Sequence, residues 1–221
     1  MRSGLLLIAL MGMPLGAAAQ DPVKVDHKHY KVLLDNKQVR VLKITYGAHE
    51  KSVMHEHPNA VAVFIDDANA KFTLADGTST PETHKAGDIE FTPAGKHLPE
   101  NVGDAPFEVV LVELKGAPAV PHAAELDAVK IDPEHHTVVL ENDRVRVLRI
   151  SLAANDKTKD HEHPNSVAVY TSDAVSTVTL GNGKTRKGGG QRGTVRWLPG
   201  ERHEVENSGA QPSEVILVEL K

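Results

Sequence analysis

The chain contains no cysteine at any of its 221 positions. It therefore forms no disulfide, and no thiolate is available to bind a metal ion or attack a substrate. An excess of basic residues is also absent: 25 Lys and Arg stand against 30 Asp and Glu, so the formal net charge is −5 and the pI is near 6.2. Binding to phosphate backbones needs a concentrated basic face, so this composition argues against nucleic acid as a partner.

The first twenty residues have the pattern of a targeting segment. Arg2 supplies a positive charge, residues 5–15 are an apolar run, and Ala17, Ala18 and Ala19 are the small residues that a signal peptidase reads. The run is too short to cross about 30 Å of hydrocarbon, which argues against the alternative of a membrane anchor. We predict a signal peptide at residues 1–19, and a mature protein that is periplasmic or secreted and has no membrane association.

The remainder of the chain is a tandem repeat. Moving residues 26–115 forward by 106 positions aligns them with residues 132–221 without a gap, and roughly four positions in ten are identical. About 90 residues with 40% hydrophobic content can bury a small core. We predict two domains, 26–115 and 132–221, joined by a proline-containing linker at 116–131.

Within each repeat the hydrophobic pattern is that of short β-strands. Residues 39–44 and 145–150 nearly alternate, and residues 109–114 and 215–220 are β-branched runs. Asn182-Gly183, like its counterpart Asp76-Gly77, lies between apolar runs and indicates a hairpin turn. No stretch inside a repeat sustains a 3.6-residue period. The sequence therefore predicts an all-β fold of barrels or sandwiches.

Histidines recur in a pattern that indicates metal binding. His-Glu-His-Pro occurs in both repeats, and a third histidine follows forty residues after the second one. Residues i and i+2 of a strand point to one face, so the first two imidazoles can bind one ion while the intervening Glu56 or Glu162 points away. Three imidazoles leave coordination positions open for water, dioxygen or substrate. The predicted ligands are His55, His57 and His97 in the first repeat and His161, His163 and His203 in the second.

These motifs resemble those of the cupin superfamily. Its second motif is similar to the Gly87…Pro93…His97…Asn101 series and to its counterpart in residues 193–207. The small single-domain cupins that include the beta-alanine degradation protein are closer still, in the Asn-Asp-Arg-Val-Arg-Val at 142–147, the Met-His-x-His-Pro at 54–58 and the Val-Glu-Leu-Lys ending. The resemblance implies a bicupin with two conical double-stranded β-helix, or jelly-roll, barrels that pack as an intramolecular pseudo-dimer. Further association into homo-oligomers is left as an alternative.

One departure from the cupin pattern bears on the metal. The carboxylate ligand expected five residues after the second histidine is replaced by Ala62 and Ala168. Germin-like manganese chemistry is therefore not favoured, whereas a three-histidine site similar to that of cysteine dioxygenase-type cupins is intact. This resemblance favours Fe(II), and zinc, copper, nickel and manganese stay open. The alternative is that the inward histidines are hydrogen-bonded core residues.

The two repeats also differ in ways that bear on function. Tyr170 replaces Phe64 two positions beyond the alanine, so we predict Tyr170 as a catalytic acid or base, with a core aromatic as the alternative. Glu90 and Arg196, which correspond, are interpreted as surface charges. Asn101 and its counterpart Asn207 are expected to orient the imidazoles. The other histidines of the repeats (His27, His29, His49, His84, His135, His136) are interpreted as surface residues, although His29 and His135 correspond, and His122 of the linker is interpreted as exposed.

Two functions from different classes fit these features. The first is a metal-dependent oxygenase acting on a small organic molecule, with the second repeat as the active one. The second is a non-enzymatic protein that binds a metal ion or small ligand in the barrel. The sequence names no substrate.

Overall fold

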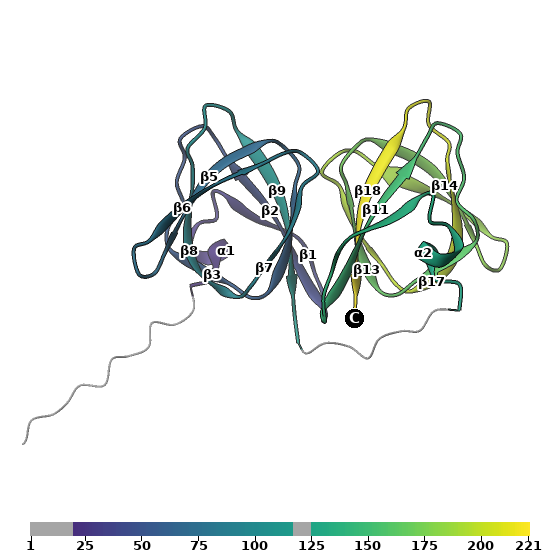
Figure 1. The fold of residues 1–221 in the computed structure, drawn as a ribbon, viewed down its shortest axis with the longest axis horizontal. Coiled ribbons are helices and arrows are strands. Elements are labelled where there is room, and N and C mark those ends of the chain that lie inside the picture. The colour runs from purple at the N-terminus through teal and green to yellow at the C-terminus, as the bar shows by residue number, and fades with distance from the viewer. Residues whose placement is uncertain (1–19, 117–124) are drawn as a thin grey trace, which may run out of the picture.

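The computed structural model describes residues 20–116 and 125–221, which form two β-barrels side by side (Figure 1). The predicted signal peptide at 1–19 lies outside the described residues, as does His122. Within them, no helix is long and apolar enough to cross a membrane.

Each barrel contains one helical turn followed by nine strands. The first is built from α1 (Pro22–Val25), β1 (Tyr30–Asp35), β2 (Val39–Tyr46), β3 (His55–His57), β4 (Ala60–Phe64), β5 (Ala68–Leu74), β6 (Ser79–His84), β7 (Ile89–Thr92), β8 (Gly95–Asn101) and β9 (Phe107–Leu114). The second is built from α2 (Ala128–Ile131), β10 (His136–Glu141), β11 (Val145–Leu152), β12 (His161–His163), β13 (Ser166–Tyr170), β14 (Ala174–Leu180), β15 (Thr185–Gly190), β16 (Val195–Leu198), β17 (Glu201–Asn207) and β18 (Ser213–Leu220).

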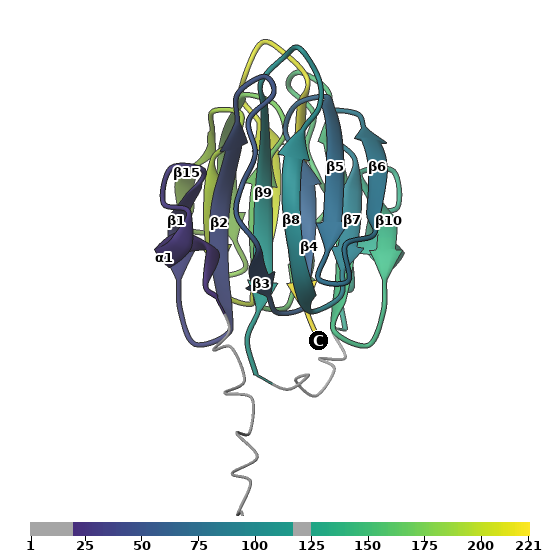
Figure 2. The same ribbon diagram turned by 90° about the vertical axis from the view of Figure 1, so that its left-hand side faces the viewer.

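The strands of each barrel form two facing antiparallel sheets. In the first barrel a five-stranded sheet of order β1-β2-β9-β4-β7 faces a four-stranded sheet of order β3-β8-β5-β6. The second barrel repeats this order as β10-β11-β18-β13-β16 and β12-β17-β14-β15. Figure 2 looks onto the four-stranded sheet of the first barrel, which lies on the side away from the second barrel. This two-sheet arrangement is the jelly-roll that the sequence predicted.

Each repeat includes the short helix that precedes its first strand. Asp21 caps α1 by accepting a hydrogen bond from the Val23 amide, and Asp127 caps α2 by accepting one from the Lys130 amide. The backbone before each turn accepts from the His-x-His strand, because the Glu56 amide donates to Gln20 and the Glu162 amide donates to Leu126. The structural repeat thus begins near residues 20 and 126, six residues earlier than the predicted boundaries, and α2 lies within the stretch interpreted as a linker.

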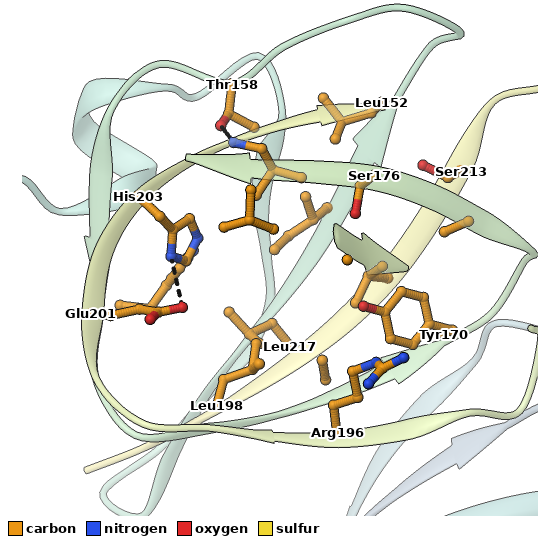
Figure 3. Close-up of a pocket in the computed structure, with 18 of the residues that line it drawn as sticks. Leu152, Thr158, Tyr170, Ser176, Arg196, Leu198, Glu201, His203, Ser213 and Leu217 are labelled. Carbon is orange, nitrogen blue, oxygen red and sulfur yellow. Dashed lines mark hydrogen bonds and ion pairs between the residues drawn. The ribbon is translucent and has the colours of Figure 1, made fainter. Parts of the chain in front are cut away.

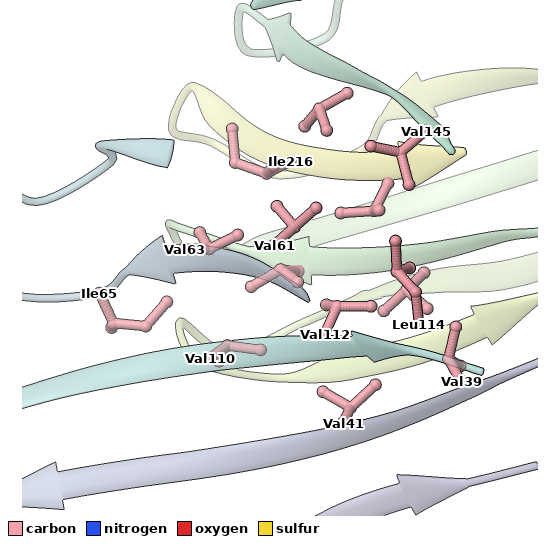
Figure 4. Packing of buried hydrophobic residues seen from close by; sticks show 14 residues of the cluster. Val39, Val41, Val61, Val63, Ile65, Val110, Val112, Leu114, Val145 and Ile216 are labelled. Carbon is pink, nitrogen blue, oxygen red and sulfur yellow. The ribbon is translucent and has the colours of Figure 1, made fainter. Parts of the chain in front are cut away.

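The two barrels pack through their five-stranded sheets. Alternate side chains of the central strands line each barrel, and those between them form one apolar layer shared by both barrels (Figure 4). This layer, here called the valine seam, consists of Val39, Val41, Val61, Val63, Ile65, Val110, Val112 and Leu114 from the first barrel and Val145, Val147, Val167, Val169, Ile216 and Val218 from the second. Burial on both faces explains why the central strands are almost continuously apolar.

We expect an isolated repeat to associate with itself. A chain of residues 126–221 would expose its part of the valine seam, so it should form dimers or larger species in sedimentation velocity, whereas the full chain should not need a partner to cover that surface. Val218→Asp in the isolated repeat should shift it toward monomer, because a carboxylate is costly to bury in that layer. A stable monomer of the unsubstituted repeat would contradict this role of the seam.

Candidate metal centres

Strand pairing brings the predicted histidines of the first barrel together. The short strand β3 pairs with β8 in a register that places His55 opposite His97. The ring centroid of His55 lies 4.8 Å from that of His57 and 5.0 Å from that of His97. One ring nitrogen from each of the three residues lies within 4.8 Å of the other two. All three side chains project into the barrel between the two sheets.

Hydrogen bonds determine which nitrogen of each ring carries its proton. The Nδ1–H of His55 donates to the Val53 carbonyl at 2.8 Å, and the Nδ1–H of His57 donates to Glu113 Oε1 at 2.7 Å. The two Nε2 atoms are then unprotonated, and they face each other at 3.1 Å. Two lone pairs at this distance repel unless a cation lies between them. A divalent ion held by both nitrogens would remove this repulsion.

Burial keeps these imidazoles neutral. Desolvation, followed by the nearby His57, lowers the pKa of His55 to about 4. Desolvation, followed by His55 and His57, lowers the pKa of His97 to about 3. Neutral imidazole is the form that binds metal, so near pH 7 His55 and His97 are in the form that acts as a ligand.

The second barrel gathers four histidines. β12 pairs with β17 so that His161 lies opposite His203, with ring centroids 4.8 Å apart. The nitrogens that lie within 4.8 Å of one another here, however, are those of His136, His161 and His163. His136 was expected at the surface, and that interpretation is wrong, because β10 begins at this residue and its side chain is fully buried.

Unsatisfied nitrogens mark the centre of this cluster. The Nδ1–H groups of His136, His161 and His163 donate to the Asp132 carbonyl, the Lys159 carbonyl and Glu219 Oε1 at 3.0, 2.6 and 2.7 Å. The Nε2 atoms of His136 and His161 are buried and have no hydrogen-bond partner. His203 Nδ1 is also without a hydrogen bond, but it lies 3.5 Å from Glu201 Oε1. Buried polar atoms rarely lack a partner, so this donor set fits a metal ion.

The first barrel has a tyrosine where the second has His136. Tyr30 corresponds to His136 and is 1% exposed. Its hydroxyl lies 3.0 Å from His55 Nε2 and 2.8 Å from the Tyr46 hydroxyl. Burial, with Tyr46 nearby, raises the pKa of Tyr30 well above its usual value, so the phenol stays protonated. The first site is therefore three imidazoles with an adjacent hydroxyl, and the second is four imidazoles.

Each site is supported by a buried glutamate that sequence reasoning missed. Glu113, which accepts from His57, also accepts from Arg40, and Arg40 Nη1 donates to Asp21 Oδ2 at 2.6 Å. The second barrel repeats this series through Glu219, Arg146 and Asp127. The signal was present in the sequence, because both the Val-Arg-Val and Val-Glu-Leu segments are identical in the two repeats. A carboxylate acceptor fixes the ring orientation and makes the imidazole a stronger donor.

The asparagines expected to orient the imidazoles have another role. Asn101 Nδ2 donates to the carbonyls of Gly47 and Ala105, and Asn207 Nδ2 donates to those of Leu152, Ala153 and Gln211. The prediction for Asn101 and Asn207 is therefore wrong: both hold loops together through the backbone.

The remaining histidines divide into surface and structural residues. His27 and His49 are exposed, as expected. His29 is buried, and its Nδ1 lies 2.7 Å from Asp26 Oδ2; the corresponding His135 repeats this pairing with Asp132. His84 stacks on Phe64 with ring centroids 3.8 Å apart.

A cavity lies beside each histidine cluster. The cavity of the first barrel measures about 230 Å³ and is lined by Phe64 and Glu90 among others; that of the second measures about 140 Å³ and is lined by Tyr170 and Arg196. Tyr170 and Arg196 lie together at one end of the second cavity, and His203 lies at the other (Figure 3). The interpretation of Glu90 and Arg196 as ordinary surface charges is thus incomplete, because both line cavities.

Comparison with known proteins gives the fold. No family model matches the sequence, and no curated protein matches it. Among solved structures, AerE from Microcystis aeruginosa superposes with a TM-score of 0.66 at 12% identity, over 92% of this chain and 97% of that chain. A variant of oxalate decarboxylase from B. subtilis gives 0.60 at 15% identity, over 83% and 69%. A cupin 2 conserved barrel domain protein from Leptotrichia buccalis gives 0.54 at 12% identity, over 87% and 88%. The chain has a bicupin fold. The cupin architecture predicted from the sequence is confirmed, and at these identities the likeness concerns the fold alone.

We expect Glu113→Gln to weaken metal binding in the first barrel about 10–100-fold, because the His57 imidazole loses its charged acceptor. Competition with a chromophoric chelator would measure the affinity of each site. Glu219→Gln should weaken the second site instead, and His97→Ala should abolish the first. Glu56→Gln is the matched control, because Glu56 lies between His55 and His57 but pairs with Lys96. Equal effects of Glu56→Gln and Glu113→Gln would contradict the role of Glu113.

We also expect metal-free protein to lose stability on acidification. The pKa values of His55, His97, His136, His161, His163 and His203 are all lowered in the folded state, those of His55 and His136 to about 4. Unfolded histidines titrate near 6.5, so below that pH the unfolded chain binds more protons. Stability is fully present above about pH 6.5 and falls as the pH drops toward 4.

Thermal unfolding of chelator-treated protein between pH 7.5 and 5 would test this. The window lies above the range in which ordinary carboxylates titrate. His135, whose pKa is raised, acts in the opposite direction but is a single group. His49→Gln should leave the slope unchanged, because that side chain is exposed. A melting temperature independent of pH would show that the histidines are not held neutral.

Proposed function

We propose that this protein is a metal-dependent oxygenase acting on a small organic molecule, with one imidazole metal site in each barrel. The observation that carries the proposal is the set of unprotonated Nε2 atoms that face one another beside a cavity, at 3.1 Å in the first barrel and without partners in the second. Such atoms are satisfied by a divalent ion, and a cavity beside them offers room for a substrate.

The ligand set guides the choice of ion. Neutral imidazoles suit iron, copper, nickel and zinc, and the alanines at the carboxylate position keep the set all-nitrogen. The similarity to three-histidine cupins favours Fe(II), which when bound would supply the activation of dioxygen. One structure of the fold-similar oxalate decarboxylase, with a TM-score of 0.56 and 15% identity, is described as having Mn(II) centres, so manganese is retained with zinc, copper and nickel.

The residues of the second barrel suit a bound substrate. Leu198, Leu217 and Val215 give its cavity apolar walls that limit water. Tyr170 is 8% exposed and is the phenol on the cavity wall. Because Tyr170 lies at the end away from His203, a substrate between them would meet the histidines at one end and the Tyr170 hydroxyl at the other (Figure 3). We therefore keep Tyr170 as the candidate proton donor of the second barrel. Its counterpart Phe64 has no hydroxyl, and the phenols that line the first cavity are those of Tyr30 and Tyr46.

A non-enzymatic binding protein is the second candidate, and one observation favours it. His136, His161 and His163 bring their nitrogens within 4.8 Å of one another, and the His203 ring lies 4.8 Å from that of His161. A site in which His203 is a fourth ligand would have fewer open coordination positions than a site of three, and closed sites are typical of ions that are held in place. In that case the same metal occupancy would be found without turnover. For either function, we propose that the mature protein is periplasmic or secreted and that its partner is a small molecule.

Dioxygen consumption by the Fe(II)-loaded mature protein would test the proposal, using a panel of small acids, thiols and flavonoids. Tyr170→Phe should lower kcat by about 10²–10⁴-fold and leave the metal content unchanged if the phenol transfers a proton. A raised KM with unchanged kcat would make Tyr170 a binding residue. Comparing His163→Ala with His57→Ala in the same assay identifies the active barrel. Full metal occupancy without consumption of dioxygen would favour the binding protein.

A further inference from the structure

The two cavities carry opposite charge at equivalent positions. In the first barrel two carboxylates, on β6 and β7, line the cavity, and an imidazole on β6 lies beside both. Their counterparts in the second barrel are two glycines and a guanidinium. The three pairs are Glu82 and Gly188, His84 and Gly190, and Glu90 and Arg196.

The carboxylates of the first barrel lack a strong cationic partner. His84 Nε2 lies 3.5 Å from Glu82 Oε2 and 3.9 Å from Glu90 Oε2. In the described part of the chain neither carboxylate forms an ion pair with lysine or arginine. Burial, with Glu82 nearby, raises the pKa of Glu90, as expected for like charges that share a partly buried site. A bound cation would relieve this repulsion.

The walls behind the carboxylates are apolar and aromatic. Phe64 stacks on His84 at 3.8 Å with an interplanar angle of 12°, and Phe72 and Phe107 line the same cavity of about 230 Å³. An ammonium group favours carboxylates and the faces of aromatic rings, and its carbon skeleton would occupy the apolar space. A bare metal ion would leave that space unused.

The second cavity has a positive charge, which favours a ligand with an acid group. Arg196 Nε donates to the Gly189 carbonyl at 3.0 Å, which fixes the guanidinium beside Tyr170 (Figure 3). Arg186 and Lys187 also line this cavity, and Arg186 forms an ion pair with Glu201. Arg196 has no carboxylate partner in the described part of the chain, so its remaining N–H groups can receive an acid group, which a guanidinium binds in a bidentate manner.

We propose that the two barrels select ligands of opposite charge. The first binds a small organic cation, a protonated amine with an apolar body held by Glu82 and Glu90, and the second binds a small organic anion through Arg196. This inference deepens the proposed function by naming the ligand class of each cavity.

Two probes with similar skeletons test the proposal by titration calorimetry on the full mature chain. Phenethylamine should bind one site per chain, and 3-phenylpropanoate should bind one other site. Glu90→Gln should weaken the amine about tenfold or more and leave the acid unchanged, because only the amine loses a charged partner. Arg196→Gln should do the reverse. Each variant thus serves as the control for the other.

Exchanging residues between equivalent positions of the two repeats provides a stronger test. Glu82→Gly combined with Glu90→Arg gives the first barrel the residues of the second at two of the three positions and removes both carboxylates, so the amine site should be lost. The proposal would be overturned if neither Glu90→Gln nor Arg196→Gln changed the affinity for either probe, or if one of these substitutions weakened both probes. Failure of both probes to bind at millimolar concentration would also overturn it.

Measuring the same binding in chelator-treated protein separates this proposal from the proposed function. Amine affinity that persists without metal supports the carboxylate site even if no dioxygen is consumed, whereas affinity that disappears with the metal would mean that the amine binds the ion directly. The ligand atoms of Glu82, His84 and Glu90 lie within 4.8 Å of one another. If elemental analysis finds a divalent ion that is lost in the Glu82 and Glu90 variants, the ligand of this cluster is a metal ion and not an amine.

Discussion

Repulsion between unprotonated imidazole nitrogens is the constraint around which each barrel is arranged. Acceptors on the opposite nitrogens hold the Nε2 atoms of His55 and His57 at 3.1 Å, and the Tyr30 hydroxyl lies 3.0 Å from the first of them. In the first barrel these acceptors are the Val53 carbonyl and Glu113. Glu113 is held by Arg40, and Arg40 by Asp21, which also caps α1. The short helix at the start of the repeat thus takes part in orienting the histidines.

The sheet that carries this support also joins the barrels. On β9, Val112 lies in the valine seam, while its neighbours Leu111 and Glu113 point into the barrel, one to the cavity and one to His57. The same holds for Val218, Leu217 and Glu219 on β18. Because successive side chains of a strand point to opposite faces, displacement of the seam would move the glutamates that orient the imidazoles.

Sequence reasoning found what the duplication preserved. The strands, the fold and the clustering of His55, His57 and His97 follow from periodicity and from a repeated motif. His136 was missed because its counterpart is Tyr30, so the comparison of repeats made it look like an unshared residue. Glu113 was missed because it lies in an apolar strand, and its role is visible only from its hydrogen bonds with His57 and Arg40. Asn101 shows the converse, because a residue retained in both copies can serve the backbone alone.

Joining the two barrels in one chain frees them from symmetry. In a dimer of identical subunits every substitution appears twice, so an acidic cavity in one barrel would require an acidic cavity in the other. Here the interface keeps nearly the same valines on both sides, while the cavities have diverged to Glu90 in one and Arg196 in the other. Gene duplication has therefore produced a protein whose halves can specialise independently without the two copies having to recognise each other as separate molecules.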